Sequence, residues 1–332
     1  MRDKRLFHVQ RLESVRKGPI LVYLKLIFTA IFWGGTFVAG RIVALEIGPF
    51  SASFLRFVIA SVCLLVISWR SHEGQLYLPD RRLIISLILL GLTGVFSYNF
   101  FFFMGLERIE AGRASLIIAS NPVLITLFAA LIFRDRLHPL AVVGILLSLS
   151  GAAIVITRGD IVDALKGHVG LGELFMFCCV LSWVAYSLIG KSVLICLTPL
   201  TSVTWSSLIG MGALAVPACI EGLPSKIGAI SFPTWIGILY LGVLGTVAGV
   251  VWYYRGIREI GPARASQFIN LVPVSAILLA SLILDEPLTP SLLVGAILVL
   301  TGITLTNLAS ARAVKSSASP LRKGNSDNGG PI

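Results

Sequence analysis

The feature that most constrains this chain is a series of ten long apolar segments separated by short polar connections. Each segment is close to the roughly 20 residues that a helix needs to cross the hydrocarbon core of a bilayer. Hydrophobic residues make up 56% of the chain and charged residues only 13%, which is more apolar than soluble domains are. The sequence therefore predicts an all-α membrane protein. The expected transmembrane helices lie near residues 21–41, 50–69, 83–105, 112–133, 139–157, 171–190, 199–219, 234–254, 264–284 and 290–309.

Lys and Arg are distributed unevenly among the connections. If the N-terminus is cytoplasmic, about 19 of them fall on the cytoplasmic side and about six on the other. This alternation predicts that both termini are cytoplasmic, in a multi-pass protein of the cell inner (cytoplasmic) membrane. A net charge of +11 is also found in nucleic-acid-binding proteins. Because topology explains the basic residues, we expect no nucleic-acid partner.

The two halves of the chain repeat each other at a spacing of about 150 residues. Trp33 and Gly40 correspond to Trp183 and Gly190. Further on, GLERIEAGRASLIIASNPV aligns with GIREIGPARASQFINLVPV, and about 19 of roughly 47 positions in this region are identical. Each repeat holds an odd number of helices, so the second starts on the opposite side of the membrane from the first. The sequence predicts two inverted-topology five-helix repeats, as in many secondary transporters.

The repeat also divides the chain into segments. We expect a basic cytoplasmic tail at 1–20, a first repeat at 21–157, a linker at 158–169, a second repeat at 170–309 and a tail at 310–332. The last segment is rich in Ser, Gly and Asn, and this composition predicts disorder.

Several motifs recur in an ordered and duplicated set. They are FWGGTFVAGRI in the first helix, PFSASFLRF at the start of the second, and RAS followed by Pro-Val in both repeats. Together they resemble the drug/metabolite transporter superfamily, and specifically its EamA-type two-repeat members, over residues 20–310. The resemblance implies an exporter or exchanger of small metabolites, often amino acids. It also implies a central cavity lined by the first, third, fourth, sixth, eighth and ninth helices, with the fifth and tenth helices peripheral.

Polar and aromatic side chains in the predicted helices are candidates for lining such a cavity. Core packing, an interfacial belt, or hydrogen bonds between helices are the alternatives. The belt suits Tyr253 and Tyr254 best, because Arg255 follows them directly. The candidates are Trp33, Thr36, Arg56, Tyr98, Asn99, Asn121, Trp183, Tyr186, Trp252, Gln267 and Asn270.

Arg56 stands out among these candidates. It lies about seven residues into the second helix, ~10 Å below the interface, where a guanidinium is costly unless it is paired or hydrated. It either snorkels along a protein surface or faces the cavity and attracts a carboxylate. Its repeat partner is Ser206, so the charge is not a symmetric structural requirement.

Charged residues at the helix ends are candidates for gating. Arg113 and Arg264 open the fourth and ninth helices, and Asp135 and Glu286 follow the ends of the same helices. Asp135, in Arg-Asp, stands where the resembled family usually has Gly-Glu. These charges are either ordinary loop charges or salt bridges that change as the two halves rock.

Small residues form stripes on the fifth and tenth helices. Gly144, Ser148 and Gly151 lie on the one, and Gly295 and Gly302 on the other. Such stripes allow helices to approach closely, either within one chain or between two copies. A homodimer through these helices is one expectation.

Three functions are compatible with the pattern: a secondary transporter, an intramembrane enzyme, and a non-transporting receptor or assembly subunit. The enzyme is disfavoured because the four histidines lie in tails or loop edges and no paired catalytic groups occur in the apolar segments. No Walker loop, cofactor motif or metal-ligand spacing is present, so we expect no cofactor. We therefore predict a transporter that moves a small solute by alternating access, with the lipid bilayer as its other partner.

Overall fold

The computed structural model describes residues 3–70, 80–133, 138–160, 170–260 and 262–318. These residues form helices and short connections, and no strand occurs among them. Ten helical spans in this part of the chain are long and apolar enough to cross a membrane, which confirms the predicted helices. The eighth span differs most from its predicted bounds, because it continues to Ile260 instead of ending near residue 254.

The first half contains five spans. They are α1 (Asp3–Ala44); α2 (Pro49–Arg70); α3 (Arg81–Leu90) with η1 (Gly91–Ser97) and α4 (Tyr98–Leu106); α5 (Ala111–Ala119) with α6 (Asn121–Phe133); and α7 (Pro139–Ile156).

The second half repeats this order. Its spans are α9 (Leu171–Val193); α10 (Pro199–Ile220); α12 (Phe232–Leu239) with η3 (Tyr240–Ala248) and α13 (Gly249–Ile260); α14 (Pro262–Ala265) with η4 (Ser266–Asn270) and α15 (Leu271–Ile283); and α16 (Pro290–Ala318). Two short helices, α11 (Leu223–Lys226) and η2 (Ile227–Ala229), connect α10 to α12.

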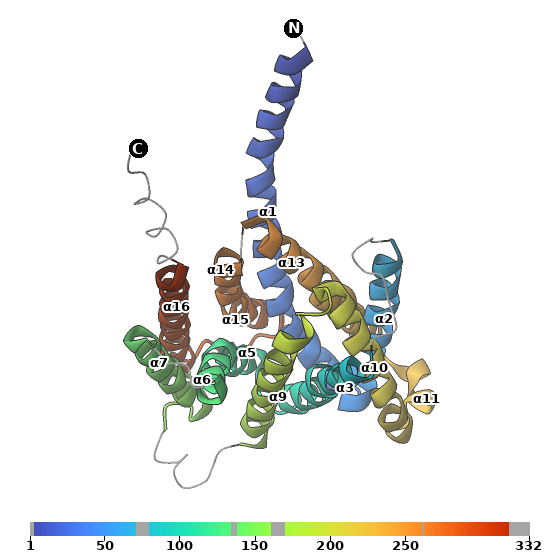
Figure 1. Ribbon diagram of the computed structural model, residues 1–332. Helices are drawn as coiled ribbons and strands as arrows, with labels where there is room; N and C mark the ends of the chain where they lie inside the picture. The colour runs from blue at the N-terminus through green and yellow to red at the C-terminus, as the bar shows by residue number, and fades with distance from the viewer. Residues whose placement is uncertain (1–2, 71–79, 134–137, 161–169, 261, 319–332) are drawn as a thin grey trace, which may run out of the picture.

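The two ends of the helix bundle differ in what they carry. The start of α1 and the end of α16 lie on the same side of the bundle, as Figure 1 shows, and we call this side the terminal end. The opposite side, where α7 ends and α9 begins, is called the linker end. Since the spans alternate in direction, equivalent helices of the two halves run in opposite directions.

Helix extends further into both tails than the sequence predicted. The first helix begins at Asp3 and the last continues to Ala318. Residues 3–17 include three Arg, two Lys and two Leu, and residues 311–318 are rich in Ala, Ser and basic residues. Many of these residue types favour helix, so the helices continue beyond the apolar segments.

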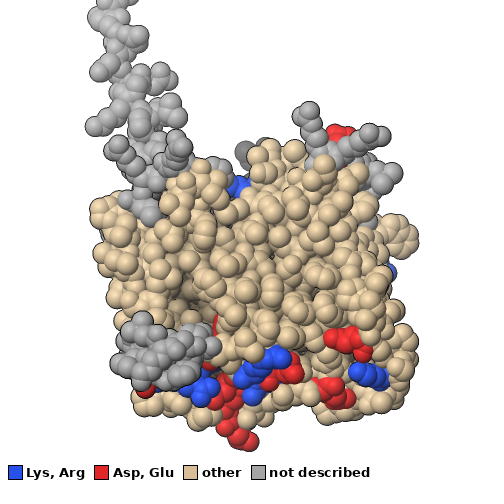
Figure 2. All heavy atoms as spheres, turned by 90° about the horizontal axis from the view of Figure 1, so that it is seen from below, with Lys and Arg blue, Asp and Glu red and all other residues tan. Residues whose placement is uncertain are grey.

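The outer surface of the bundle is broadly apolar. Large hydrophobic side chains such as Ile85, Leu146, Leu282 and Ile297 are between 60% and 79% exposed. In Figure 2, most of the charged side chains gather along one margin and leave a wide band of other residues. An apolar band of this kind fits the hydrocarbon core of a bilayer, where charges are costly.

The glycine stripes of α7 and α16 face each other within the chain, and Figure 1 shows these two helices side by side. A Cβ atom on Gly302 would lie 2.5 Å from both the carbonyl oxygen of Gly144 and the amide nitrogen of Ser148. A Cβ on Gly151 would lie 2.8 Å from the carbonyl oxygen of Gly295. The stripes therefore pack one helix against another in the same molecule. The homodimer through these helices stays a prediction, without support from the stripes.

Gly302→Ala is expected to destabilise the protein, because the added methyl group would press on the backbone of α7. Overpacking of this kind costs about 1–3 kcal/mol. The matched control is Gly212→Ala in α10, where an added Cβ meets no atom within 4 Å. There the better helix propensity of Ala predicts a gain of up to about 1 kcal/mol. Thermal unfolding of the purified protein in detergent measures both, and equal effects would contradict the assigned packing.

Candidate functional site

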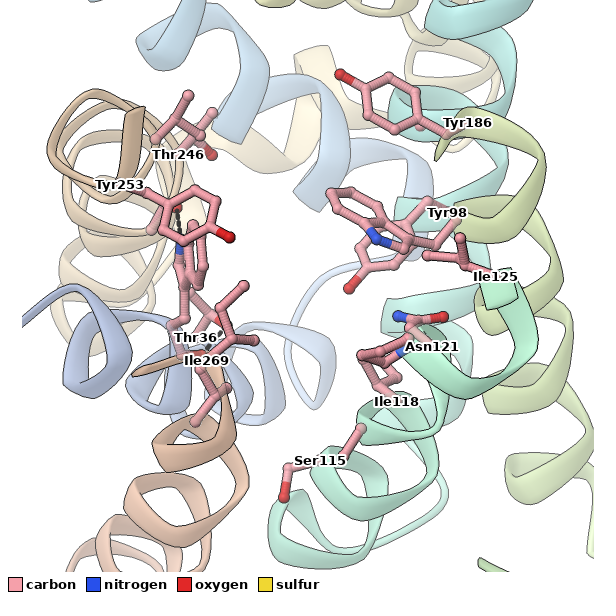
Figure 3. A pocket seen from close by; sticks show the side chains of 18 of the residues that line it. Thr36, Tyr98, Ser115, Ile118, Asn121, Ile125, Tyr186, Thr246, Tyr253 and Ile269 are labelled. Atoms are coloured by element: carbon pink, nitrogen blue, oxygen red, sulfur yellow. Dashed lines mark hydrogen bonds between the residues drawn. The ribbon is translucent and has the colours of Figure 1, made fainter. Parts of the chain in front are cut away.

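A cavity of about 550 Å³ lies in the centre of the bundle, between the two halves. This volume is in the range of small-molecule sites. Its lining begins at Ser115, one turn from the linker-end start of α5, and reaches Ser266 and Asn307 near the terminal end. Figure 3 shows Thr246 and Tyr253 of the second half on one wall, opposite Tyr98 and Asn121 of the first.

Two π-helical segments shape the walls of this cavity. They are η1 and η3, which occupy corresponding positions in the two repeats. The wide turns of π-helix are frequent at functional sites because they redirect side chains and backbone groups. The Asn99 amide donates to the carbonyl of Val95 at 2.8 Å, and the Thr246 hydroxyl donates to the carbonyl of Leu241 at 3.0 Å. Both side chains are thus fixed at the cavity wall.

Arg56 of α2 reaches into the cavity and is held by these two residues. Its Nη1 donates to Asn99 Oδ1 at 2.8 Å, and its Nε and Nη2 donate to Thr246 Oγ1 at 3.3 and 3.2 Å. The guanidinium therefore joins the first half to the second. Its carbon Cζ also lies 5.4 Å from the centre of the Phe57 ring, within the range of a cation–π contact.

The fourth and ninth spans are interrupted beside the cavity. Helix α5 stops before Ser120 and α6 starts at Asn121, while η4 gives way to α15 after Asn270. Pro122 and Pro273 lack the amide hydrogen that a continuous helix would use at these places. Asn121 is only 8% exposed, and its Oδ1 has no hydrogen-bond partner. Figure 3 shows that Oδ1 points away from the cavity and that the amide nitrogen of the same side chain faces it, as a donor for a bound molecule.

Aromatic rings cover much of both walls. On one side, the Trp183 ring lies 5.2 Å from Tyr98 and 5.1 Å from Tyr186. On the other, Trp33 lies 5.4 Å from Tyr253, and its indole Nε1 donates to the carbonyl of Gly245 at 2.9 Å. The cavity thus combines an apolar aromatic lining with a few fixed polar groups.

Most of the side chains singled out from the sequence come together in this cavity. Those that line it are Trp33, Thr36, Arg56, Tyr98, Asn99, Asn121, Trp183, Tyr186 and Asn270. Trp252 and Gln267, the other two candidates, are not among the residues that line it. Trp252 packs against Phe32, with ring centres 5.5 Å apart, because adjacent residues of a helix point in directions about 100° apart. Gln267 is exposed on η4.

Sequence reasoning missed several lining residues. Tyr253 was assigned to an interfacial belt because Arg255 follows it, but α13 continues to Ile260 and places Tyr253 deeper. The tenth span, expected to be peripheral, contributes Ile303 and Asn307. The second and seventh spans also line the cavity. The correspondence of Arg56 in the second span with Ser206 in the seventh was the sequence signal that could have predicted this. Both of those residues line the cavity.

The linker end is closed by carboxylates that join the two halves. Glu286, from the second half, accepts from the amides of Ala111 and Gly112 at 2.7 and 3.0 Å, at the start of α5 in the first half. A carboxylate is favourable at a helix N-terminus because it satisfies free amides and faces the positive end of the helix dipole. Arg41 Nε lies 3.3 Å from the same carboxylate, and its Nη1 donates to the carbonyls of Leu106 and Ile109.

Two more glutamates cap helices of the opposite half. Glu221 accepts from the amide of Ser51 at 2.6 Å at the start of α2. Glu46 accepts from the amide of Ser231 at 2.6 Å and from the hydroxyls of Ser231 and Thr234 at the start of α12. Hydrogen bonds from Ser231 and Thr234 lower the pKa of Glu46 below its ordinary value, since they favour the charged carboxylate.

Arg113 forms the most buried of the ion pairs in the described residues. Its Nη1 lies 3.2 Å from Glu173 Oε1, and the two side chains are 5% and 6% exposed. Arg113 belongs to α5 in the first half and Glu173 to α9 in the second. Of the other gating candidates, Arg264 is exposed at the terminal end, and Asp135 lies outside the described residues.

The fold and the site define a class: a multi-pass membrane protein of two five-helix repeats around a central cavity that lies between them. The profile of the EamA-like transporter family matches residues 20–157 and 170–308, and the chain belongs to this family.

Individual relatives agree with this assignment. The chain is 30% identical to the "Uncharacterized transporter YyaM" of Bacillus subtilis, over 85% of this chain and 92% of that protein. It is 26% identical to a "Probable amino-acid metabolite efflux pump" of Escherichia coli, over 87% and 94% of the two chains. A solved structure, titled "Crystal structure of protein", shares the fold with a TM-score of 0.58 and 21% identity, over 87% and 97%. Family and relatives point to a transporter of the drug/metabolite superfamily rather than to an enzyme.

Proposed function

We propose that this protein is a secondary transporter that exports or exchanges a small metabolite, such as an amino acid, by alternating access. The observation that carries the proposal is the asymmetry of the central cavity. On the terminal side the lining includes Asn307, two residues before the end of the tenth span, whereas carboxylates and ion pairs between the halves close the linker end. Two inverted halves around one site can rock against each other, and this motion exchanges a state closed at the linker end for a state closed at the terminal end.

The direction of transport follows from the distribution of basic residues. With both termini in the cytoplasm, as the positive-inside pattern predicts, the terminal end faces the cytoplasm. The cavity then accepts solute from inside the cell. The name of the Escherichia coli relative, a probable amino-acid metabolite efflux pump, supports export as the direction.

Solute flux in proteoliposomes tests the proposal. Purified protein is reconstituted, and uptake of a panel of labelled metabolites, amino acids included, is compared with empty liposomes. We expect saturable flux of some members and faster flux when the vesicles are preloaded with the same solute. Complete inertness toward a broad panel, from a protein that is folded by thermal unfolding, would favour a non-transporting receptor or assembly subunit instead.

A further inference from the structure

The charge of the cavity lining is unbalanced. Of the described residues that line it, Arg56 is the sole charged side chain, and no Asp, Glu or His is among them. None of the ion pairs within the described part of the chain involves Arg56. Its two partners, Asn99 and Thr246, are neutral acceptors that fix its position without cancelling its charge. The site therefore presents one positive charge in surroundings of low dielectric.

The guanidinium also keeps hydrogen-bonding capacity. It has five N–H groups, of which Nε, one on Nη1 and one on Nη2 are used by Asn99 and Thr246. One N–H on each terminal nitrogen is left for a ligand. An Arg that is held in place and offers donors on both terminal nitrogens suits a carboxylate, with which such donors form charge-assisted hydrogen bonds.

We infer that the transported solute is a carboxylate with a net charge of −1, whose carboxylate binds Arg56 and whose apolar or aromatic body lies against the rings. The inference rests on the proposed function and names the substrate class of that site. A phosphate monoester fits less well, because it carries about −1.5 to −2 charges and only one compensating charge is present.

The rest of the lining selects against a second charge on the solute. The wall opposite Thr246 carries Asn121, whose amide nitrogen faces the cavity in Figure 3 and suits a carbonyl or hydroxyl oxygen of the solute better than an ammonium group, since both would be donors. An ammonium group would have to leave water without a carboxylate in the lining to pair with, which is costly in an apolar site. An N-acylated, hydroxy or keto acid therefore fits better than the zwitterionic amino acid, and a cation fits worst.

Three ligands of almost the same shape test this order at pH 6, where amines are fully protonated: 3-phenyllactate, which is an anion, phenylalanine, a zwitterion, and phenylalanine amide, a cation. Binding is measured by isothermal calorimetry or by thermal shift with purified protein, with phenyl phosphate as a fourth ligand. We expect the anion to bind about ten- to hundredfold more tightly than the cation, the gain from one or two charge-assisted hydrogen bonds. The zwitterion should lie between them, and phenyl phosphate should bind more weakly than the anion.

Arg56→Gln is expected to remove most of the preference for the anion, and Arg56→Lys to retain part of it. The matched control is Arg70→Gln at the exposed end of the same helix, which should leave the order unchanged. An anion preference that survives in a folded Arg56→Gln protein, or a wild-type preference for the cation, would overturn the inference. If the solute that proves to be transported is a cation or a neutral molecule, the inferred substrate charge is wrong while the proposed transport function holds. If the protein transports no solute of the broad panel, the proposed transport function is contradicted, and the inference about its substrate is contradicted with it.

Discussion

Glu173→Leu is expected to lower the free energy of unfolding by about 3–5 kcal/mol, because it leaves the Arg113 guanidinium buried without a counter-charge. Arg113 is 5% exposed, and its Nε already has no hydrogen-bond partner, lying 3.9 Å from the half-exposed Glu110. Glu173 is therefore the principal group that compensates this charge. Since the pair joins α5 to α9, its loss should also loosen the contact between the two halves at the linker end.

Chemical or thermal unfolding in detergent, followed by tryptophan fluorescence, measures this effect. Two variants make the result specific. Glu107→Leu breaks an exposed ion pair with Arg108 and should cost less than about 1 kcal/mol. Arg113→Met combined with Glu173→Leu removes both buried charges and should recover much of the lost stability. Equal destabilisation by Glu173→Leu and Glu107→Leu, or no recovery in the double variant, would contradict a buried ion pair.

Hydropathy and the internal repeat made the helices and most of the cavity predictable. The position of each span follows from local composition. Polar and aromatic residues are few inside the apolar segments, so they could be selected as cavity candidates from the sequence. Trp33 and Asn99 were found in this way. Directions on a helix were harder to predict, because a shift of one residue decides whether Trp252 or Tyr253 faces the cavity.

The closing contacts at the linker end were largely unpredictable. Glu46 and Glu221 lie in or next to loops and look like ordinary interfacial charges in the sequence. Their role as caps depends on which helix of the opposite half begins beside them, and this follows from the three-dimensional packing of the halves. Glu286 was identified as a gating candidate because it follows the end of a repeat helix. Its capping of α5 required the structure.

The linker-end carboxylates differ in charge from their repeat partners at the terminal end. Glu46 corresponds to Cys196 and Glu173 to Tyr23, so two carboxylates of the linker end have neutral counterparts at the terminal end. Glu286 corresponds to Asp135, which keeps the charge on a shorter side chain. Inverted halves of the same backbone would otherwise close either end with similar strength. We therefore expect the carboxylate contacts of the linker end to favour the state in which that end is closed.

Glu286→Ala is accordingly expected to open the linker end. The change removes two charge-assisted hydrogen bonds to the start of α5 and the ion pair with Arg41, and each such bond to a charged group contributes about 1.5–3 kcal/mol. If even part of this energy separates the two states, their ratio changes by about ten- to hundredfold. The state that is open at the linker end should then become populated without solute.

Labelling of a single cysteine measures this opening. Ser115, deep in the cavity and near the linker end, is replaced by cysteine in a protein whose native cysteines are replaced, and an impermeant thiol reagent is added to one side of sealed vesicles. Protease cleavage of an N-terminal tag identifies that side. Glu286→Ala should raise the labelling rate about tenfold or more from the side opposite the tag, following the population shift. Glu107→Gln, at the same end but exposed, should not change it. An unchanged rate in a folded Glu286→Ala protein would mean that this carboxylate caps α5 without holding the linker end shut.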